Sequence, residues 1–379
     1  MITDQYRLQR FIGKILPDGN RTSFCCTRAG FGASTVRVCT KCVDDGGVSV
    51  SIHGVAYCSS VWVCPVCSRV IRNKRAKRTT DVFRRTMAAG YNLLFVTYTL
   101  AHDLTMPLGE LLQRQRRAWR IFTNSYAYRE AVKSFGTGWH MRALEVTHSP
   151  TAGWHPHYHA VYAMRSAVSD AIVESLYYAW AAACSEVGAV TNRKAWHYEL
   201  VQDPTTAASY LASWGGGDFK LGYEVAADKK GRRSSRSPFQ LAADAMDGDE
   251  SAERWFVEYA AAIRGSRAQT WSRAWRDTFA LEDTEDETIT DGDLVENGAD
   301  VAVVLHTYEY EKLGSCRDEF ILAVAGRDLS GLYDILDRRS MTCILVNLPL
   351  FYGGRGSVKD TLHYGGAWAR ADHLEYIAR

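Results

Sequence analysis

The feature that most constrains this chain is a run of three alternating histidines that leads directly into an apolar segment. His155, His157 and His159 occupy every second position, and the chain continues as Ala-Val-Tyr-Ala over residues 160–163. Alternate residues of a β-strand share one face, so a strand here places three imidazoles side by side. An isolated His-x-His pattern is more often an exposed strand edge. Converging imidazoles, however, are typical of a divalent-metal site.

The preceding residues predict the partner strand of a β-hairpin. Residues 141–148 alternate like a strand, and residues 149–153 (Ser-Pro-Thr-Ala-Gly) have the composition of a turn. Folding the chain in the middle of this turn brings Glu145 close to His157. A carboxylate beside His157 and His159 forms a mixed nitrogen and oxygen ligand set. That set predicts a Mg²⁺ or Mn²⁺ site rather than a closed zinc site.

Length and composition indicate a globular chain. Its 379 residues leave room for two or three domains with a sizeable core. No run approaches the roughly 20 apolar residues of a membrane span, and residues 1–7 do not resemble a signal peptide. We therefore expect a cytoplasmic protein without a membrane partner, in which cysteines are reduced or bound to metal.

The net charge of +2 conceals a segregation of charge along the chain. Residues 282–300 contain nine acidic and no basic residues, which leaves +11 for the rest. Basic residues concentrate at 69–85, 114–120 and 229–236. A single basic cluster is often only a solvated face. Three clusters that flank a predicted metal site favour a polyanionic partner.

Seven of the ten cysteines fall in the first 67 residues. Two Cys-x-x-Cys pairs provide a candidate tetrahedral Zn²⁺ site: Cys39, Cys42, Cys64 and Cys67. Residues 46–54 between them read as a short hairpin strand, as in a zinc ribbon. Cys58 can replace one member of a pair. Cys25 and Cys26 are adjacent and cannot easily serve one site together, so either can be a plain core residue.

The middle of the chain alternates strand and helix patterns in a recognisable order. We expect a strand at 93–100, a helix opened by Pro107, the hairpin at 141–163, a helix capped by Ser169, and a strand at 195–201. The order β-α-β-β-α-β predicts an α+β, ferredoxin-like domain with a four-stranded antiparallel sheet and helices on one face.

A further helix begins after the last of these strands. Asp203 is a suitable N-cap, Pro204 fits the first helical position, and the glycines at 215–217 end the helix. Tyr210 lies on the apolar stripe of this helix, so periodicity alone interprets it as a core aromatic. A helix that packs back on the sheet can also bring the phenol over a metal held by the central strands.

These motifs together resemble the plasmid rolling-circle replication initiators (Rep proteins) of the HUH endonuclease superfamily. The similar branch has one catalytic tyrosine and an N-terminal zinc-binding region, and the resemblance runs from about Cys39 to about Asp277. The segments that carry it are 58–67, 95–102, 153–159 with Glu145 upstream, 208–212, 237–241, 258–259 and 271–273.

The resemblance implies a role for each matching residue. The implied residues are Tyr210 as nucleophile, His157, His159 and Glu145 as metal ligands, and His102, His155 and Lys220 as residues that support the metal or face the substrate. Two positions depart from the family pattern. Many members have lysine where this chain has Ser213, for which Lys220 can substitute, and some have glutamate where this chain has Thr206.

The implied activity is metal-dependent nicking and rejoining of one DNA strand through a 5′-phosphotyrosine. The implied partners are plasmid origin DNA, single-stranded or hairpin, and the host helicase and DNA polymerase. The residues expected to contact DNA are Arg72, Lys74, Arg75, Lys77, Arg78, Arg116 and Arg117. Two alternatives remain: a related HUH transposase or mobilisation relaxase, and a non-enzymatic zinc-ribbon regulator that binds DNA.

These patterns divide the chain into five regions. We expect a zinc-binding region at 1–75, an HUH endonuclease domain at 76–235, a helical extension at 236–281, an acidic linker at 282–300 and a small α/β unit at 301–379.

Overall fold

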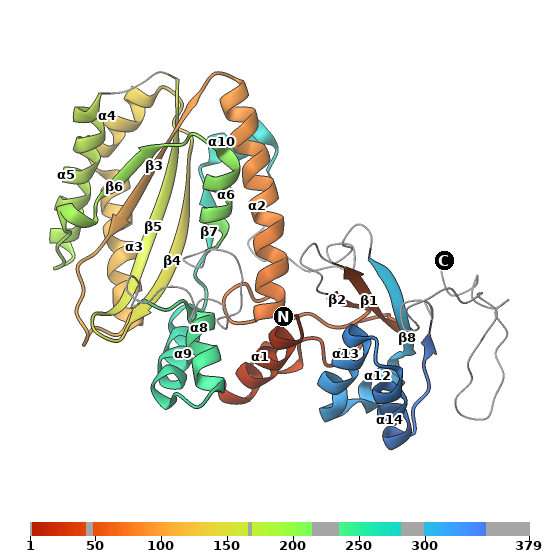
Figure 1. Ribbon diagram of the computed structural model, residues 1–379. Coiled ribbons are helices and arrows are strands. Elements are labelled where there is room, and N and C mark those ends of the chain that lie inside the picture. The colour runs from red at the N-terminus through yellow and green to blue at the C-terminus, as the bar shows by residue number, and fades with distance from the viewer. Residues whose placement is uncertain (1, 43–47, 166–168, 214–234, 282–298, 346–379) are drawn as a thin grey trace. The chain divides into compact units, whose positions relative to one another are not determined.

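The computed structural model describes residues 2–42, 48–165, 169–213, 235–281 and 299–345 (Figure 1). The chain forms two compact units. The terminal unit comprises Met1–Ser60, Cys64–Val70 and Thr288–Arg379, and the central unit comprises Val61–Val63 and Ile71–Glu287. Among the helices within the described ranges, none is both long and apolar enough to cross a membrane.

The central unit is built on a five-stranded antiparallel sheet in the order β6-β3-β5-β4-β7. Its strands are β3 (Asn92–Thr99), β4 (His140–Ser149), β5 (Gly153–Met164), β6 (His197–Leu200) and β7 (Gln269–Trp271). The first four lie within a few residues of the predicted strands and follow the predicted order along the chain. Strand β7 was not predicted, and it pairs with the free side of β4.

The helices of the central unit begin where the sequence provides caps. They are α3 (Leu108–Asn124), α4 (Tyr126–Phe135), α5 (Asp170–Glu186), the 3-10 turn η2 (Arg193–Ala195), α6 (Pro204–Ser213), α8 (Pro238–Met246), α9 (Glu250–Ala262) and α10 (Arg273–Phe279). Pro107 and Ser169 occupy the N-cap positions of α3 and α5, although the Ser169 side chain makes no capping hydrogen bond. The carboxylate of Asp203 accepts the backbone N–H groups of Thr205 and Thr206 at the start of α6. The predicted end of α6 at 215–217 lies outside the described residues.

Helix α2 (Pro65–Ala88) begins in the terminal unit, and its residues from Ile71 onward belong to the central unit.

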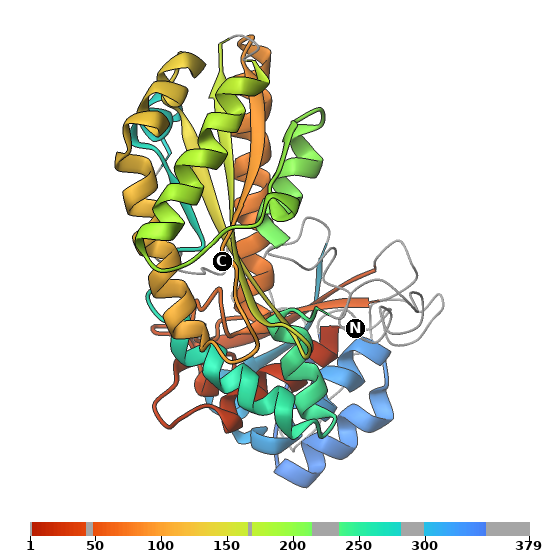
Figure 2. The same ribbon diagram turned by 90° about the vertical axis from the view of Figure 1, so that its left-hand side faces the viewer.

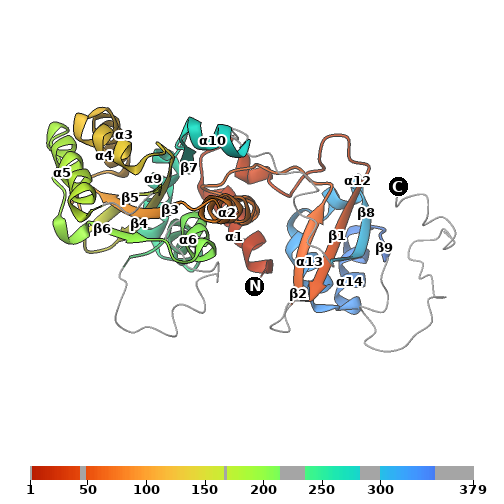
Figure 3. The same ribbon diagram turned by 90° about the horizontal axis from the view of Figure 1, so that it is seen from above.

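The two faces of the central sheet are covered by different helices. On one face, the buried Tyr98 contacts Trp119 of α3 and Trp180 of α5, with ring centroids 5.2 and 5.4 Å away. Helices α3, α4 and α5 cross this face (Figure 2), whereas α2 and α6 lie on the other side of the sheet (Figure 3). The two helices of the predicted β-α-β-β-α-β order, α3 and α5, thus lie on one face as expected, and α2 and α6 are further helices on the other face. The second face carries the odd-numbered side chains of β4 and β5, including the three histidines.

The terminal unit joins segments from both ends of the chain. Its sheet has the order β2-β1-β8-β9 and comprises β1 (Thr35–Cys42), β2 (Val48–His53), β8 (Asp300–His306) and β9 (Ile344–Leu345). Its helices are α1 (Ile2–Ile15), η1 (Arg21–Phe24), α12 (Thr307–Lys312), η3 (Gly314–Cys316), α13 (Arg317–Gly326) and α14 (Leu329–Arg339). Helices α12 to α14 lie on one side of this sheet (Figure 1).

This arrangement corrects the predicted division of the chain. Strand β8 pairs with β1 in a register that sets Thr35 opposite His306. Residues 301–345 therefore complete the N-terminal sheet instead of forming a separate α/β unit. A strand pairing across more than 250 residues leaves no trace in local periodicity, which explains the error.

The half-buried His140 at the start of β4, whose Nδ1 is shielded from solvent, predicts a pH dependence of stability. Burial lowers its pKa to about 4, against about 6.5 in an unfolded chain. Between pH 4 and pH 6.5 the unfolded state binds a proton at His140 that the folded state does not. The contribution of His140 to the free energy of unfolding is therefore fully present above pH 6.5 and is lost as the pH falls toward 4. We expect His140→Gln to reduce the slope of unfolding free energy against pH by up to about 1.4 kcal/mol per pH unit. Urea unfolding from pH 7 to pH 5 measures it, and equal slopes in both proteins would contradict the expectation.

Candidate functional site

The β4–β5 hairpin brings one carboxylate and two imidazoles together. The register pairs Glu145 with His157 and Ala143 with His159, which confirms the predicted pairing of Glu145. The turn lies between Ser149 and Gly153 and is closed by the Ala152 N–H, which donates to the Ser149 carbonyl. One ligand atom from each of Glu145, His157 and His159 lies within 4.8 Å of the other two.

Neighbouring groups orient this cluster. Nε2 of His159 lies 2.5 Å from Oε2 of Glu145, and its Nδ1 lies 3.1 Å from the Thr97 hydroxyl on β3. Both Glu145 and His159 are buried, at 7% and 3% exposure. Burial lowers the pKa of His157 to about 4, although Glu145 opposes this shift. A neutral His157 keeps a ring lone pair for a cation near neutral pH, so the donor set fits a hard divalent ion bound by nitrogen and carboxylate.

Tyr210 on α6 lies beside this cluster. Its ring centroid is 5.2 Å from that of His159 and 5.7 Å from that of Phe95, with edge-on geometry in both cases. The residue is 47% exposed, whereas Ala208 and Leu211 of the same helix are buried. Tyr210 is therefore not the core aromatic that periodicity alone indicated. The Arg84 guanidinium on α2 donates to the Thr205 hydroxyl at 2.9 Å, which links α2 to the first turn of α6.

The basic residues of α2 differ in exposure. Lys74 and Lys77 are exposed, Arg72 and Arg78 are half-buried, and Arg75 is buried. Burial lowers the pKa of Arg72 to about 10, while Tyr259 and Glu145 oppose this shift. The guanidinium of Arg72 also lies 5.6 Å from the ring centroid of Phe239. The two lysines thus lie on the solvent-exposed side of the helix, whereas the buried Arg75 lies on its packed side.

Other predicted residues lie elsewhere. Arg116 and Arg117 are exposed on α3, which covers the opposite face of the sheet from Glu145. Arg116 donates to the Ser266 hydroxyl at 2.8 Å. Lys220 lies outside the described residues, as does most of the predicted basic cluster at 229–236. The predicted acidic linker lies outside them too, apart from its last two residues.

His155 and His102 lie together, next to the Glu145–His157–His159 cluster. His155 shares the strand face of His157, and their ring centroids are 6.2 Å apart. His102, in the loop after β3, approaches His155 edge-on with a centroid separation of 4.0 Å. His155 therefore lies between His157 and His102, and its supporting or substrate-facing role stays a prediction.

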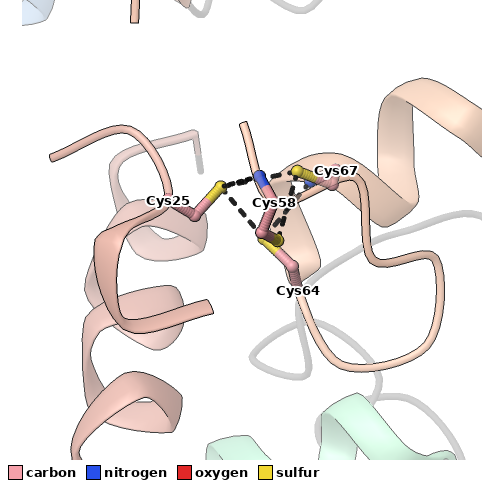
Figure 4. Close-up of side chains that lie close together, drawn as sticks. All are labelled: Cys25, Cys58, Cys64 and Cys67. Carbon is pink, nitrogen blue, oxygen red and sulfur yellow. Dashed lines mark hydrogen bonds between the residues drawn. The ribbon is translucent and has the colours of Figure 1, made fainter. Parts of the chain in front are cut away.

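Four cysteines of the terminal unit converge in a second cluster. Cys25 follows η1, Cys58 lies in the segment after β2, Cys64 precedes α2, and Cys67 is in the first turn of α2 (Figure 4). All four are buried. Cys25 Sγ lies 3.4 Å from Cys67 Sγ and 3.6 Å from Cys64 Sγ, and the Cys58 and Cys67 sulfurs are 3.7 Å apart.

The sulfur geometry fits a tetrahedral ion. With Zn–S bonds of about 2.3 Å, the edge of a ZnS₄ tetrahedron is roughly 3.8 Å, close to the separations observed. Hydrogen bonds from the neighbouring thiols lower the pKa of Cys58, whereas burial raises that of Cys64. Such a set favours a bound cation, which stabilises all four groups as thiolates.

The structure corrects the predicted ligand set, because Cys39 and Cys42 are not in this cluster. Both belong to strand β1, where residues three apart point to opposite faces, so this Cys-x-x-Cys cannot direct two thiolates at one ion. Cys39 lies opposite Ser51 in the sheet, and Cys42 is exposed and accepts a hydrogen bond from Arg327.

Sequence reasoning missed Cys25 as a cluster member. Cys25 has no Cys-x-x-Cys partner, and its approach to Cys67 depends on a contact between segments 42 residues apart. Retaining Cys58 as an alternative was correct, but substituting it for one member of the two pairs still gave four ligands, so no sequence signal pointed to Cys25.

Comparison with known proteins gives two relatives. The chain is 27% identical over 331 residues to the Rep protein ("Protein rep") of Streptomyces lividans, across 68% of this chain and 72% of that protein. It is 28% identical over 142 residues to the neomycin resistance protein of Streptomyces cyanogenus, across 30% of this chain and about a third of that relative. No family model matches the chain, and no solved structure matches it.

Proposed function

We propose that this protein is a plasmid rolling-circle replication initiator of the HUH endonuclease type, which nicks and rejoins one strand of origin DNA. The observation that carries the proposal is the position of Tyr210, whose ring lies 5.2 Å from that of His159 in the Glu145–His157–His159 cluster. The similarity to the Streptomyces lividans Rep protein and the ferredoxin-like order of the first four central strands support it.

Each residue then has a chemical task. The Tyr210 phenolic oxygen attacks the scissile phosphorus, and the bond from phosphorus to the 3′ oxygen breaks. The phenol loses its proton and the departing oxygen gains one, so the products are a 5′-phosphotyrosine and a free 3′ hydroxyl that primes synthesis. A Mg²⁺ or Mn²⁺ ion held by Glu145, His157 and His159 would supply charge stabilisation at the phosphate. Because the phosphotyrosine is a phosphodiester, a later attack by a 3′ hydroxyl can rejoin the strand.

The remaining features support DNA as the substrate. Lys74 and Lys77 are exposed on α2 and can contact phosphates. The four-cysteine cluster would hold a structural Zn²⁺ in the terminal unit. Unwinding of the duplex and synthesis from the freed 3′ hydroxyl would involve a host helicase and DNA polymerase as partners, and the cytoplasm is where they would occur.

A covalent-capture experiment tests the proposal. The full chain is incubated with Mn²⁺ and single-stranded oligonucleotides that tile the DNA around its gene, and denaturing gels are searched for a protein–DNA adduct. We expect an adduct with one short region only. Binding to DNA without any adduct, across all tiles, would instead favour a non-enzymatic regulator.

The two metal sites are expected to respond differently to chelation. A hard, partly hydrated ion at Glu145, His157 and His159 should exchange quickly, whereas thiolate-bound zinc should not. Brief EDTA treatment should therefore abolish nicking, and Mn²⁺ should restore it without any change in zinc content. Activity assays with parallel zinc analysis measure both effects.

The ligands themselves provide the matched variants. His157→Ala and His159→Ala should remain inactive at any Mn²⁺ concentration, whereas excess metal should partly rescue Glu145→Ala because both imidazoles remain. Full activity of His159→Ala at ordinary Mn²⁺ concentrations would exclude this cluster as the catalytic site.

A further inference from the structure

His102 is held in one orientation next to the metal cluster. Its Nδ1 lies 3.1 Å from the Leu100 carbonyl oxygen, which can only accept a hydrogen bond. Nδ1 must therefore carry the proton, and in the neutral ring Nε2 keeps its lone pair. Metal-binding histidines are commonly oriented by such a bond from the other ring nitrogen. His159 has a comparable arrangement, with Nδ1 on the Thr97 hydroxyl and Nε2 toward Glu145.

The free nitrogen of His102 and that of His155 are both shielded from solvent. Within the part of the chain that the structure describes, neither Nε2 atom has a hydrogen-bond partner. The rings approach each other edge-on with centroids 4.0 Å apart. Two buried ligand atoms without partners therefore occupy one small region, which is a costly arrangement unless a further group binds there.

A close backbone approach fixes this juxtaposition. Gly153, the first residue of β5, has a φ of +79°, and a Cβ built there would lie 2.9 Å from the Asp103 carbonyl oxygen. Only glycine accommodates both constraints without strain. The loop that contains His102 therefore packs closely against the start of β5, the strand that contains His155.

We propose that His102 and His155 form a second cation site, separate from the Glu145–His157–His159 cluster. Two ligand nitrogens of a tetrahedral ion lie roughly 3.3 Å apart when the metal–nitrogen bonds are about 2.0–2.1 Å. Two imidazoles on one tetrahedral ion have ring centroids roughly 5 Å apart, so these rings, now 4.0 Å apart, would have to separate by about 1 Å to bind it. With imidazole donors only, the site should select a borderline ion such as Ni²⁺, Co²⁺ or Zn²⁺ and reject Mg²⁺. Water would complete the coordination.

The number of Ni²⁺ ions bound per chain tests the second site without measuring nicking. A negative result would therefore reject the second site and leave the proposed function untouched. The full chain with its cysteine zinc retained is treated with EDTA, desalted and titrated with Ni²⁺ by calorimetry and equilibrium dialysis. We expect two Ni²⁺ ions per chain in the wild type, one in His102→Gln, one in His159→Ala and none in the double variant. The exposed His197 is the control, and His197→Gln should bind two.

A second variant separates ligation from ring packing. His155→Phe keeps an aromatic ring beside His102 but has no nitrogen, so it should fold, as circular dichroism would show, and bind one Ni²⁺. One Ni²⁺ per chain in the wild type, unchanged in His102→Gln and His155→Phe, would overturn the proposal and leave the pair as a ring contact only. Saturation of the second site only at millimolar Ni²⁺ would overturn it as well.

Discussion

Tyr210→Phe should abolish covalent joining to DNA while leaving metal and DNA binding nearly unchanged. The substitution removes only the phenolic oxygen, and phenylalanine retains the edge-on ring contacts with His159 and Phe95. Without the nucleophile no phosphotyrosine can form, so we expect nicking to fall below detection rather than by a modest factor. Mass spectrometry of the peptide–oligonucleotide adduct locates the modified residue, and Mn²⁺ titration of the variant checks the metal site.

Tyr178 offers a matched control for this substitution. It is 67% exposed on α5, a helix on the opposite face of the sheet. Tyr178→Phe should therefore nick at the wild-type rate. An adduct on Tyr177, Tyr178 or Tyr198 would show that the nucleophile is misassigned. Tyr198 is the least suited of these, because its hydroxyl already donates to the Asp170 carboxylate.

The convergence of Glu145, His157 and His159 was predictable because its geometry is local. A three-residue turn and strict alternation fix which residues of β4 and β5 face each other, so the pairing of Glu145 with His157 follows from the sequence pattern. The start of helix α6 was also predictable from local sequence, since the side chain of Asp203 caps its first turn. The contact between Tyr210 and His159 required the additional expectation that α6 packs on the sheet.

The features that were not predictable depend on distant contacts. Strand β8 pairs with β1 although most residues of the central unit lie between them in the sequence, and no local periodicity specifies that pairing. The burial of Arg75 within a strongly basic helix also could not be predicted from composition, because composition does not distinguish buried from exposed basic residues of α2. The approach of His102 to His155 depends on a loop that meets the strand at Gly153.

The cysteine ligands show how secondary structure overrides a motif. Cys39-x-x-Cys42 and Cys64-x-x-Cys67 have the same spacing, but the second lies at a helix start. There the chain turns, and the Cys67 N–H approaches Cys64 Sγ at 3.5 Å. The first lies in an extended strand with thiols on opposite faces. The spacing alone could not show which of the two Cys-x-x-Cys motifs binds an ion, since residues 35–42 form a strand by pairing with β2 and β8.

Removal of any of the four clustered cysteines should release the zinc and unfold the terminal unit around it. In small zinc units metal binding contributes an apparent 10–16 kcal/mol or so to folding, about as much as the whole stability of a typical domain. Cys25, Cys58, Cys64 and Cys67 join segments before β1, after β2 and at the start of α2, so the ion would link all three. We expect about one Zn²⁺ per chain in the wild type and almost none in Cys58→Ser or Cys64→Ser.

Cys39 and Cys42 provide the decisive comparison, because the sequence motif and the structure disagree about them. Cys42→Ser should retain full zinc, since this thiol is exposed and contacts only Arg327 among the partners seen in the described ranges. Cys39→Ser should also retain it, although its burial in β1 makes some loss of stability expected. Metal analysis of the purified proteins, with limited proteolysis of residues 1–60 as the folding readout, distinguishes the two ligand sets. Zinc loss in Cys42→Ser with retention in Cys25→Ser would restore the paired Cys-x-x-Cys site, because a thiolate that ligates the ion cannot be replaced by a hydroxyl without weakening a tetrahedral ZnS₄ centre.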